Sequence, residues 1–228
     1  MIDPKREELQ EGYKWLIGLD VGYDVNDKEA YTFQIIEHLL KSRFESEGFI
    51  KNIIEIIVFD SIIGNEDRHQ ENWSIIVTNQ LVDRRTIFGH RKPVTETLYT
   101  FAPIYDSGSS MGRELTDARI THMLTNNMQL EAYIQRGQSE IHWEGEKGKQ
   151  KHLDLITKVS KIGYREMVLD IIGSIKSKYQ KETITNVIDN VDACLPEEHL
   201  SRKIPRTRKD FLIKLISLRF DKLFELQL

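Results

Sequence analysis

The feature that most constrains the fold of this chain is an isoleucine-rich run that ends at a polar loop. The run extends from Phe49 to Ile63 and leaves little polar face. Its main apolar residues are Ile50, Ile53, Ile54, Ile57, Val58 and Ile62. Isoleucine-rich runs also form strands, but about fifteen residues without a break favour a buried helix. Gly64 and Asn65 provide a stop signal, so we expect the polar loop 64–72 to emerge from the end of a core helix.

A β-hairpin is predicted directly after this loop. Residues 73–78 are rich in β-branched side chains, which favour a short strand. Residues 97–105 predict a second strand, and the polar segment 79–96 between them predicts a long connection. We expect this hairpin to return Asp106 to a position beside Asp67.

The remainder of the chain predicts helices, and hence a mainly α fold that carries a small β-hairpin. Apolar residues recur at helical spacing over residues 27–47, with Gly48 as a plausible stop. One helix is expected near 114–124, and helical stripes continue through 151–228. Because there is neither an internal repeat nor a low-complexity linker, one domain over 1–228 is the simplest expectation.

Three oxygen-bearing side chains follow the core helix in an order typical of phosphoryl transfer. Asn72 lies five residues after Asp67, and Asp106 follows the second predicted strand. Protein kinases use an Asp-x-x-x-x-Asn catalytic loop followed by a metal-binding Asp. Mg²⁺ takes oxygen ligands and is usually held by one or two carboxylates plus phosphate oxygens. Asp and Asn are also common in ordinary turns, so this interpretation depends on the whole composite of helix, loop, strand and second carboxylate.

The composite resembles the HipA-like kinase family and, more distantly, the phosphoinositide 3- and 4-kinases. The residues that carry the resemblance are Asp67-Arg68-His69-Gln70-Glu71-Asn72 and the segment 102–110, Ala-Pro-Ile-Tyr-Asp-Ser-Gly-Ser-Ser. The likeness extends over residues 50–115 and is general in the helical flanks. It implies a protein-kinase-like C-terminal lobe that uses Mg²⁺ and ATP to phosphorylate a serine or threonine hydroxyl of a protein substrate.

The resemblance also implies roles for individual residues. Asp67 would be the catalytic carboxylate, and His69 would be the catalytic-loop histidine that organises the loop. Asn72 and Asp106 would bind the magnesium ion and, through it, the nucleotide. The secondary candidates are Arg68 and Asn65.

The half of a kinase that grips ATP is not recognisable in the sequence. Kinases carry a lysine on an N-lobe strand and a glycine-rich loop over the phosphates, and neither motif occurs before Asp67. We therefore expect a C-lobe without its N-lobe, which a separate N-lobe would complete. One alternative is a split or degenerate kinase that acts as a binding or regulatory module. A lipid or small-molecule kinase is a weaker alternative. The family also makes a toxin–antitoxin context and an antitoxin-like or DNA-binding partner conceivable.

Composition excludes several other classes. The net charge of −4 argues against a generic nucleic-acid binder. The single Cys194 excludes an internal disulfide and favours a reducing compartment. No apolar run approaches the roughly 18 residues that span a bilayer, and the charged N-terminus lacks the apolar core of a signal peptide. A cytoplasmic location is the expectation.

Overall fold

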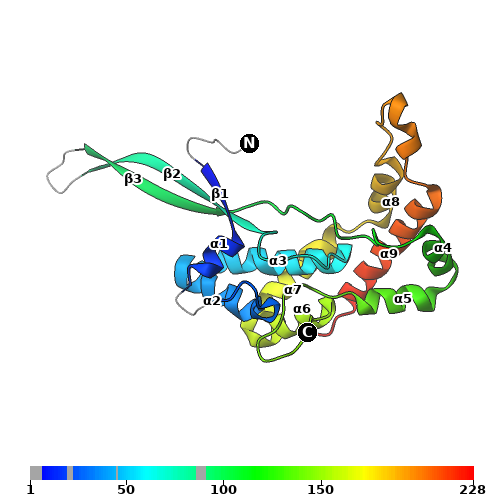
Figure 1. The fold of residues 1–228 in the computed structure, drawn as a ribbon, viewed down its shortest axis with the longest axis horizontal. Helices are drawn as coiled ribbons and strands as arrows, with labels where there is room; N and C mark the ends of the chain where they lie inside the picture. The colour runs from blue at the N-terminus through cyan, green and yellow to red at the C-terminus, as the bar shows by residue number, and fades with distance from the viewer. Residues whose placement is uncertain (1–6, 20–22, 45, 86–90) are drawn as a thin grey trace. The chain divides into compact units, whose positions relative to one another are not determined.

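The computed structural model of the chain describes residues 7–19, 23–44, 46–85 and 91–228, without the side chains of 83–85 and 91. The described residues are mostly helical, with a three-stranded antiparallel sheet (Figure 1). They group into two compact units. The first unit comprises residues up to 52, 68–106 and 141–147, and the second comprises 53–67, 107–140 and 148–228.

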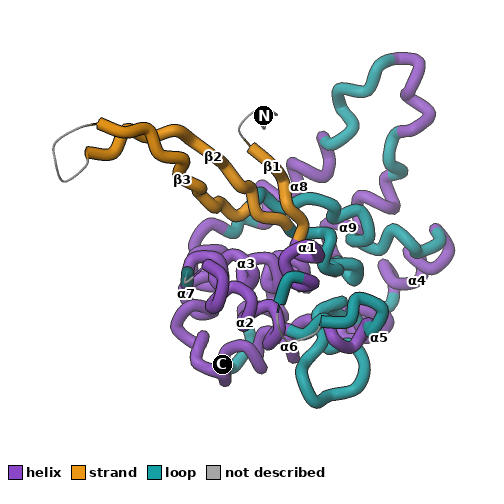
Figure 2. The backbone as a smooth tube through the Cα atoms, turned by 60° about the vertical axis from the view of Figure 1, so that its left-hand side comes forward, coloured by secondary structure: helices purple, strands orange, loops and turns teal. Residues whose placement is uncertain are grey.

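The sheet belongs to the first unit. Its strands are β1 (Glu7–Glu11), β2 (Ser74–Arg85) and β3 (Arg91–Phe101), in the order β1-β2-β3. Figure 2 shows β2 and β3 continuing as a two-stranded ribbon beyond the end of β1. In the register, Ile75 lies opposite both Gln10 of β1 and Phe101 of β3. The predicted hairpin is therefore confirmed, although its second strand ends at Phe101 and not at residue 105. β1 is a strand that the sequence did not reveal.

The expected long connection over 79–96 is wrong, because most of this segment is strand. Gln80 pairs with Glu96 and Asp83 pairs with Pro93. The ribbon has exposed side chains on β3 from position 92 to 95, so no apolar alternation marks it as a strand. Pro93 is tolerated because β3 is an edge strand. Proline has no backbone N–H, but among the described residues no further strand needs a donor on the outer side of β3. Backbone hydrogen bonds between the two strands extend both of them, and the polarity of the side chains does not predict this pairing.

The helix expected over 27–47 is divided. A 3₁₀ turn at Lys28–Ala30 is followed by α2 (Phe33–Phe44). Between them the backbone pairs with another segment: Phe33 N donates to His142 O at 3.1 Å, and His142 N donates to Tyr31 O at 2.9 Å. These bonds replace the helical bonds that the periodicity predicted. Gly48 is not a stop, since it lies in the first turn of α3 (Glu47–Ile63).

Aromatic rings pack the first unit between the sheet and its helices. Trp15 of α1 (Gly12–Ile17) meets Phe44 edge-on at 4.9 Å between ring centroids. Tyr99 of β3 lies 5.2 Å from Phe44, and Phe101 stacks on Trp73 with centroids 5.9 Å apart. Edge-to-face and offset rings at these separations stabilise beyond the area they bury.

The second unit is helical. Its helices after α3 are α4 (Asp117–Thr125), α5 (Asn127–Arg136), α6 (His152–Val159), α7 (Arg165–Lys178), α8 (Lys181–Asn190) and α9 (Arg206–Phe224). The buried helix predicted at 49–63, a helix near 114–124 and the C-terminal helices are all confirmed. α5 was not predicted, because only Leu130 and Ile134 of its residues are buried. Among the described residues, no helix is long and apolar enough to cross a membrane.

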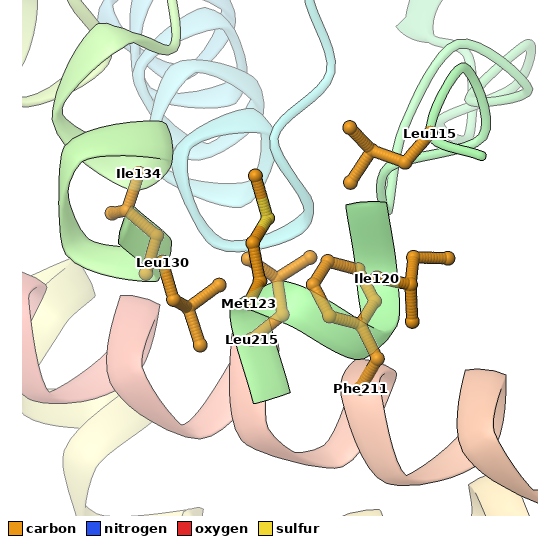
Figure 3. Close-up of a cluster of buried hydrophobic side chains, with 7 residues drawn as sticks. All are labelled: Leu115, Ile120, Met123, Leu130, Ile134, Phe211 and Leu215. Atoms are coloured by element: carbon orange, nitrogen blue, oxygen red, sulfur yellow. The ribbon is translucent and has the colours of Figure 1, made fainter. Parts of the chain in front are cut away.

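A hydrophobic cluster joins α4, α5 and α9 in this unit (Figure 3). Its members are Leu115, Ile120, Met123, Leu130, Ile134, Phe211 and Leu215. Side-chain caps start both short helices: Thr116 Oγ1 accepts from Arg119 N, and Asn126 Oδ1 accepts from Gln129 N. The cluster holds α9 in the unit, and α9 supplies a buried arginine to the end of α3.

Candidate active site

The four predicted site residues are divided between the two units. Asp67 belongs to the second unit, whereas His69, Asn72 and Asp106 belong to the first. The prediction that Asp106 lies beside Asp67 therefore stays a prediction. Each unit nevertheless fixes its own part of the loop through specific hydrogen bonds.

The loop leaves α3 through a cap built on Asp60. Backbone N–H groups of Gly64 and Asn65 both donate to the Asp60 carbonyl, at 2.7 and 3.1 Å. The Asn65 side-chain amide donates to the Asp60 carboxylate at 3.1 Å, and both side chains are buried. Gly64 has φ +66°, a conformation that glycine adopts without steric cost. The start of the loop is therefore fixed from inside the second unit.

Asp67 is held at an exposed position by its neighbours in the second unit. Its backbone N–H donates to Asn65 Oδ1 at 3.4 Å, and Ser109 Oγ donates to Asp67 Oδ2 at 3.2 Å. The segment that carries Ser109 is itself tied down, because Met111 N donates to Ile63 O at 2.8 Å. A serine hydroxyl therefore already occupies a hydrogen-bonding position on the predicted catalytic carboxylate.

In the first unit, Arg68 connects the loop to the segment that follows the hairpin. Its side chain is 1% exposed, and its Nη1 donates to Asn72 O at 2.8 Å and to Tyr105 O at 2.6 Å. Because one nitrogen bonds both carbonyls, the backbone of Asn72 lies next to the residue that precedes Asp106. Charge-assisted bonds to buried carbonyls are among the stronger protein hydrogen bonds.

Tyr105 adds a second connection between the same two segments. Its hydroxyl donates to Glu71 O at 2.7 Å and shares a 2.5 Å hydrogen bond with Ser74 Oγ. Burial is the largest cause that raises the pKa of Tyr105 above its ordinary value, so the hydroxyl keeps its proton. Arg68 and Tyr105 thus hold the loop and the end of the hairpin together.

The local backbone conformation fixes the positions of His69 and Asp106. His69 Nδ1 accepts a hydrogen bond from Glu71 N at 3.3 Å, and Asn72 N donates to His69 O at 2.9 Å. The imidazole therefore closes a tight turn directly before Asn72. Asp106 has φ +48°, and its side chain is exposed. Asp tolerates the left-handed region better than most residues, and non-glycine residues in this region recur at functional sites.

Several residues of this network were not assigned structural roles from the sequence. They are Asp60, Ser74 and, as hydrogen-bonding groups, Tyr105 and Ser109. Asp60 had a usable signal, since it is a carboxylate near the end of a mainly apolar helical run and a buried carboxylate requires partners. The secondary candidates Arg68 and Asn65 are both buried and contact backbone or side chains of the loop.

The donor atoms fit a magnesium ion better than a softer metal. Asn72 offers an amide oxygen and Asp106 a carboxylate, which are hard oxygen ligands of the kind that Mg²⁺ takes. Within the described residues, no group of three or more His, Cys, Asp or Glu side chains is arranged to hold a metal. Magnesium in nucleotide sites is usually bound by one or two protein carboxylates, because phosphate oxygens and water molecules supply its other ligands.

Comparisons with known proteins bear on the fold. No protein-family model matches the chain, and no curated protein matches its sequence. Its structure is similar to the crystal structure of a Helicobacter pylori proinflammatory kinase, CtkA, with a TM-score of 0.67. The similarity covers 97% of this chain and 70% of that kinase, at 20% sequence identity. The chain has a kinase-like fold.

This similarity confirms the kinase part of the prediction at the level of fold. At 20% identity it does not extend to the substrate or to the HipA-like family. The residue roles inferred for the loop remain predictions.

Proposed function

We propose that this chain is the C-terminal lobe of a HipA-like serine/threonine kinase, which transfers the γ-phosphoryl group of Mg-ATP to a protein hydroxyl. The observation that carries the proposal is the Arg68 bridge. One guanidinium nitrogen bonds the carbonyls of both Asn72 and Tyr105. The bridge thereby ties the predicted metal-binding amide to the residue before the predicted metal-binding carboxylate. The fold similarity to a kinase supports the same reaction class.

In this proposal each residue has one task. Mg-ATP supplies the phosphoryl group and the cation that neutralises its charge. Asn72 and Asp106 provide oxygen ligands to that cation, and Asp67 orients the substrate hydroxyl and accepts its proton. His69 acts on the loop rather than on the substrate, since its Nδ1 is engaged by the backbone of Glu71. Catalysis of this kind depends mainly on positioning and electrostatic stabilisation.

The lysine and the loop that grip the nucleotide are proposed to come from a separate N-lobe. The exposed edge of β3 in the first unit is a sheet edge to which such a segment could add. If the chain acts without an N-lobe, it would serve instead as a binding or regulatory module.

Isothermal titration of the 228-residue chain with ATP, with and without Mg²⁺, tests the metal site. We expect Mg²⁺ to tighten ATP binding at least tenfold, and Asp106→Asn to abolish that gain. Asp170→Asn removes another exposed carboxylate, from α7, and is the matched control. Equal ATP affinity with and without Mg²⁺ in the unchanged chain would contradict the proposed metal ligands.

Transfer of phosphate from γ-labelled ATP to a protein acceptor, by the chain together with a polypeptide that supplies its N-lobe, tests the reaction. Asp67→Asn is expected to lower the rate by about 10²–10⁴-fold, the usual contribution of a positioned proton acceptor. Mg-ATP binding without any transfer, even with the N-lobe present, would favour the regulatory module. Transfer only to a lipid or small molecule would overturn the assignment of a protein substrate.

A further inference from the structure

A small cavity in the second unit collects cationic side chains outside the predicted active site. Its volume is about 160 Å³, and it lies where the end of α5, the start of α6 and the last turns of α9 meet. The charged or titratable residues that line it are Lys151, His152, Asp154, Arg219 and Lys222. Three of these carry a positive charge and one a negative charge. The cavity therefore favours an anion.

Two buried nitrogen atoms of this lining have no hydrogen-bond partner within the described residues. They are Nε of Arg219 and Nε2 of His152. Arg219 is 5% exposed and His152 is 4% exposed, so bulk water does not reach them freely. Buried polar groups in native proteins are nearly always satisfied. An unpaired nitrogen on an arginine that lines a cavity therefore indicates a missing acceptor.

The remaining contacts of Arg219 leave room for such an acceptor. Its Nη1 donates to Ser61 O at 3.0 Å, at the end of α3. Glu66 and Glu114 are the acidic groups whose charges act on it, together with Tyr133, and none of the three lines the cavity. Asp154 is the acidic residue in the lining, and its side chain is exposed. The Arg219 side chain therefore retains N–H groups that no acceptor within the described residues engages.

Backbone geometry adds a second source of positive potential. Lys151 is the N-cap of α6, and its side chain makes no capping bond. The first N–H groups of a helix lack intrahelical partners and favour anions. His152 N donates instead to Gly137 O at 3.3 Å, which leaves the amides of Leu153 and Asp154, both in the lining, as further donors.

The size of the cavity selects the ligand class. Drug-sized ligands occupy roughly 300–1,000 Å³, whereas one water takes about 30 Å³. A volume of about 160 Å³ is sufficient for a tetrahedral oxyanion and lies below the range for a whole nucleotide. We propose that this cavity is a phosphate-binding site, in which Arg219, His152 and the start of α6 hold a phosphoryl group. The proposal does not rest on the kinase function, because none of these residues belongs to the predicted active site.

Titration of the chain with inorganic phosphate, followed by ¹⁵N–¹H NMR of the histidine rings, tests this site. We expect the His152 ring signals to shift and saturate, while those of the exposed His122 stay unchanged. Sodium chloride at matched ionic strength is the control for screening. If the His152 signals do not move with phosphate beyond their response to chloride, the proposal fails.

Variants then locate the contacts. Arg219→Gln is expected to weaken phosphate binding tenfold or more, because charge-assisted hydrogen bonds are lost. Arg219 also caps α3, so the Arg219→Gln variant can fail to fold. Two further variants test the site without removing this cap. Lys222→Gln and Lys151→Gln should each weaken binding about two- to fivefold at the rim. Lys161→Gln, outside the lining, should leave the affinity unchanged. Unchanged affinity in both rim variants would overturn the site.

A phosphoserine peptide distinguishes the two sources of the phosphoryl group. If a phosphorylated residue is the natural occupant, the peptide will bind more tightly than inorganic phosphate and will compete with it at His152. If free phosphate is the occupant, the peptide will be excluded while phosphate still binds. Either result supports a phosphate site. If neither the peptide nor inorganic phosphate binds, the proposal is contradicted.

Discussion

The guanidinium of Arg68 donates a 2.6 Å hydrogen bond to the backbone oxygen of Tyr105, 37 residues further along the chain. The same nitrogen bonds the carbonyl of Asn72. A buried cation inside the predicted catalytic loop thus fixes the segment that leads into Asp106. Its task is positioning, since Nη1 donates to two protein carbonyls.

Replacing Arg68 tests how much this bridge contributes to stability. Arg68→Met keeps the apolar stem but leaves the carbonyls of Asn72 and Tyr105 without this donor. We expect the free energy of unfolding to fall by about 2–4 kcal/mol, because each unsatisfied buried group costs about 1–3 kcal/mol. Urea unfolding measures the change, with the exposed Arg113→Met as the control. A loss below about 0.5 kcal/mol, typical of surface positions, would refute the bridge.

The hydroxyl of Tyr105 is a separable contribution. Tyr105→Phe removes its bonds to Ser74 and to the Glu71 carbonyl without changing the ring. The expected loss of unfolding free energy is about 1–2 kcal/mol. Tyr99→Phe is the matched control, because Tyr99 packs by its ring on Trp15 and Phe44. Equal effects of the two substitutions in thermal or urea unfolding would show that the Tyr105 hydroxyl contributes nothing special.

Gly64 combines a special backbone conformation with a close approach. A Cβ at this position would lie 2.4 Å from Nη2 of Arg219, at φ +66°. Gly145 also has positive φ, +79°, but open space around its Cβ position. Gly145→Ala should therefore cost about 1–2 kcal/mol for backbone strain alone, and Gly64→Ala should cost more. The difference in unfolding free energy isolates the contact with Arg219, and a Gly64→Ala variant no less stable than Gly145→Ala would contradict it.

His152 predicts a specific acid sensitivity. Burial, with a smaller effect from the charge of Arg219, lowers the pKa of His152 from 6.5 to about 3. Below pH 6.5 the unfolded chain binds a proton that the folded chain does not. The contribution of this group therefore falls as the pH falls from 6.5 to about 3, by up to about 1.4 kcal/mol per pH unit.

The measurement compares urea unfolding of the unchanged chain and His152→Gln at pH 7, 6 and 5. Other groups titrate in both proteins, so the difference between them isolates His152. We expect the unchanged chain to lose stability faster on acidification than the variant. The exposed His122→Gln variant should follow the unchanged chain. Parallel pH profiles for the unchanged chain and His152→Gln would show that the histidine is not held neutral.

Local signals were sufficient for the parts of the fold that depend on neighbouring residues. The isoleucine run predicted α3 because a long, unbroken apolar segment must be buried, and Gly64 marked its end correctly. The length of strands β2 and β3 was underestimated, because strand pairing depends on a partner strand and not on the polarity of the side chains. The length of the helix predicted at 27–47 was overestimated for the same reason, since backbone pairing with His142 divides this segment.

The sequence by itself determined the core helix, the hairpin and the order of Asp67, Asn72 and Asp106, because spacing and hydrophobic pattern are local properties. Only the tertiary structure decided which residues hold that loop. Arg68 reaches Tyr105 and Arg219 reaches Ser61 across 37 and 158 positions of the chain. Such contacts carry no periodic signal. They arise because buried carbonyls need donors, and folding determines which distant side chain can supply one.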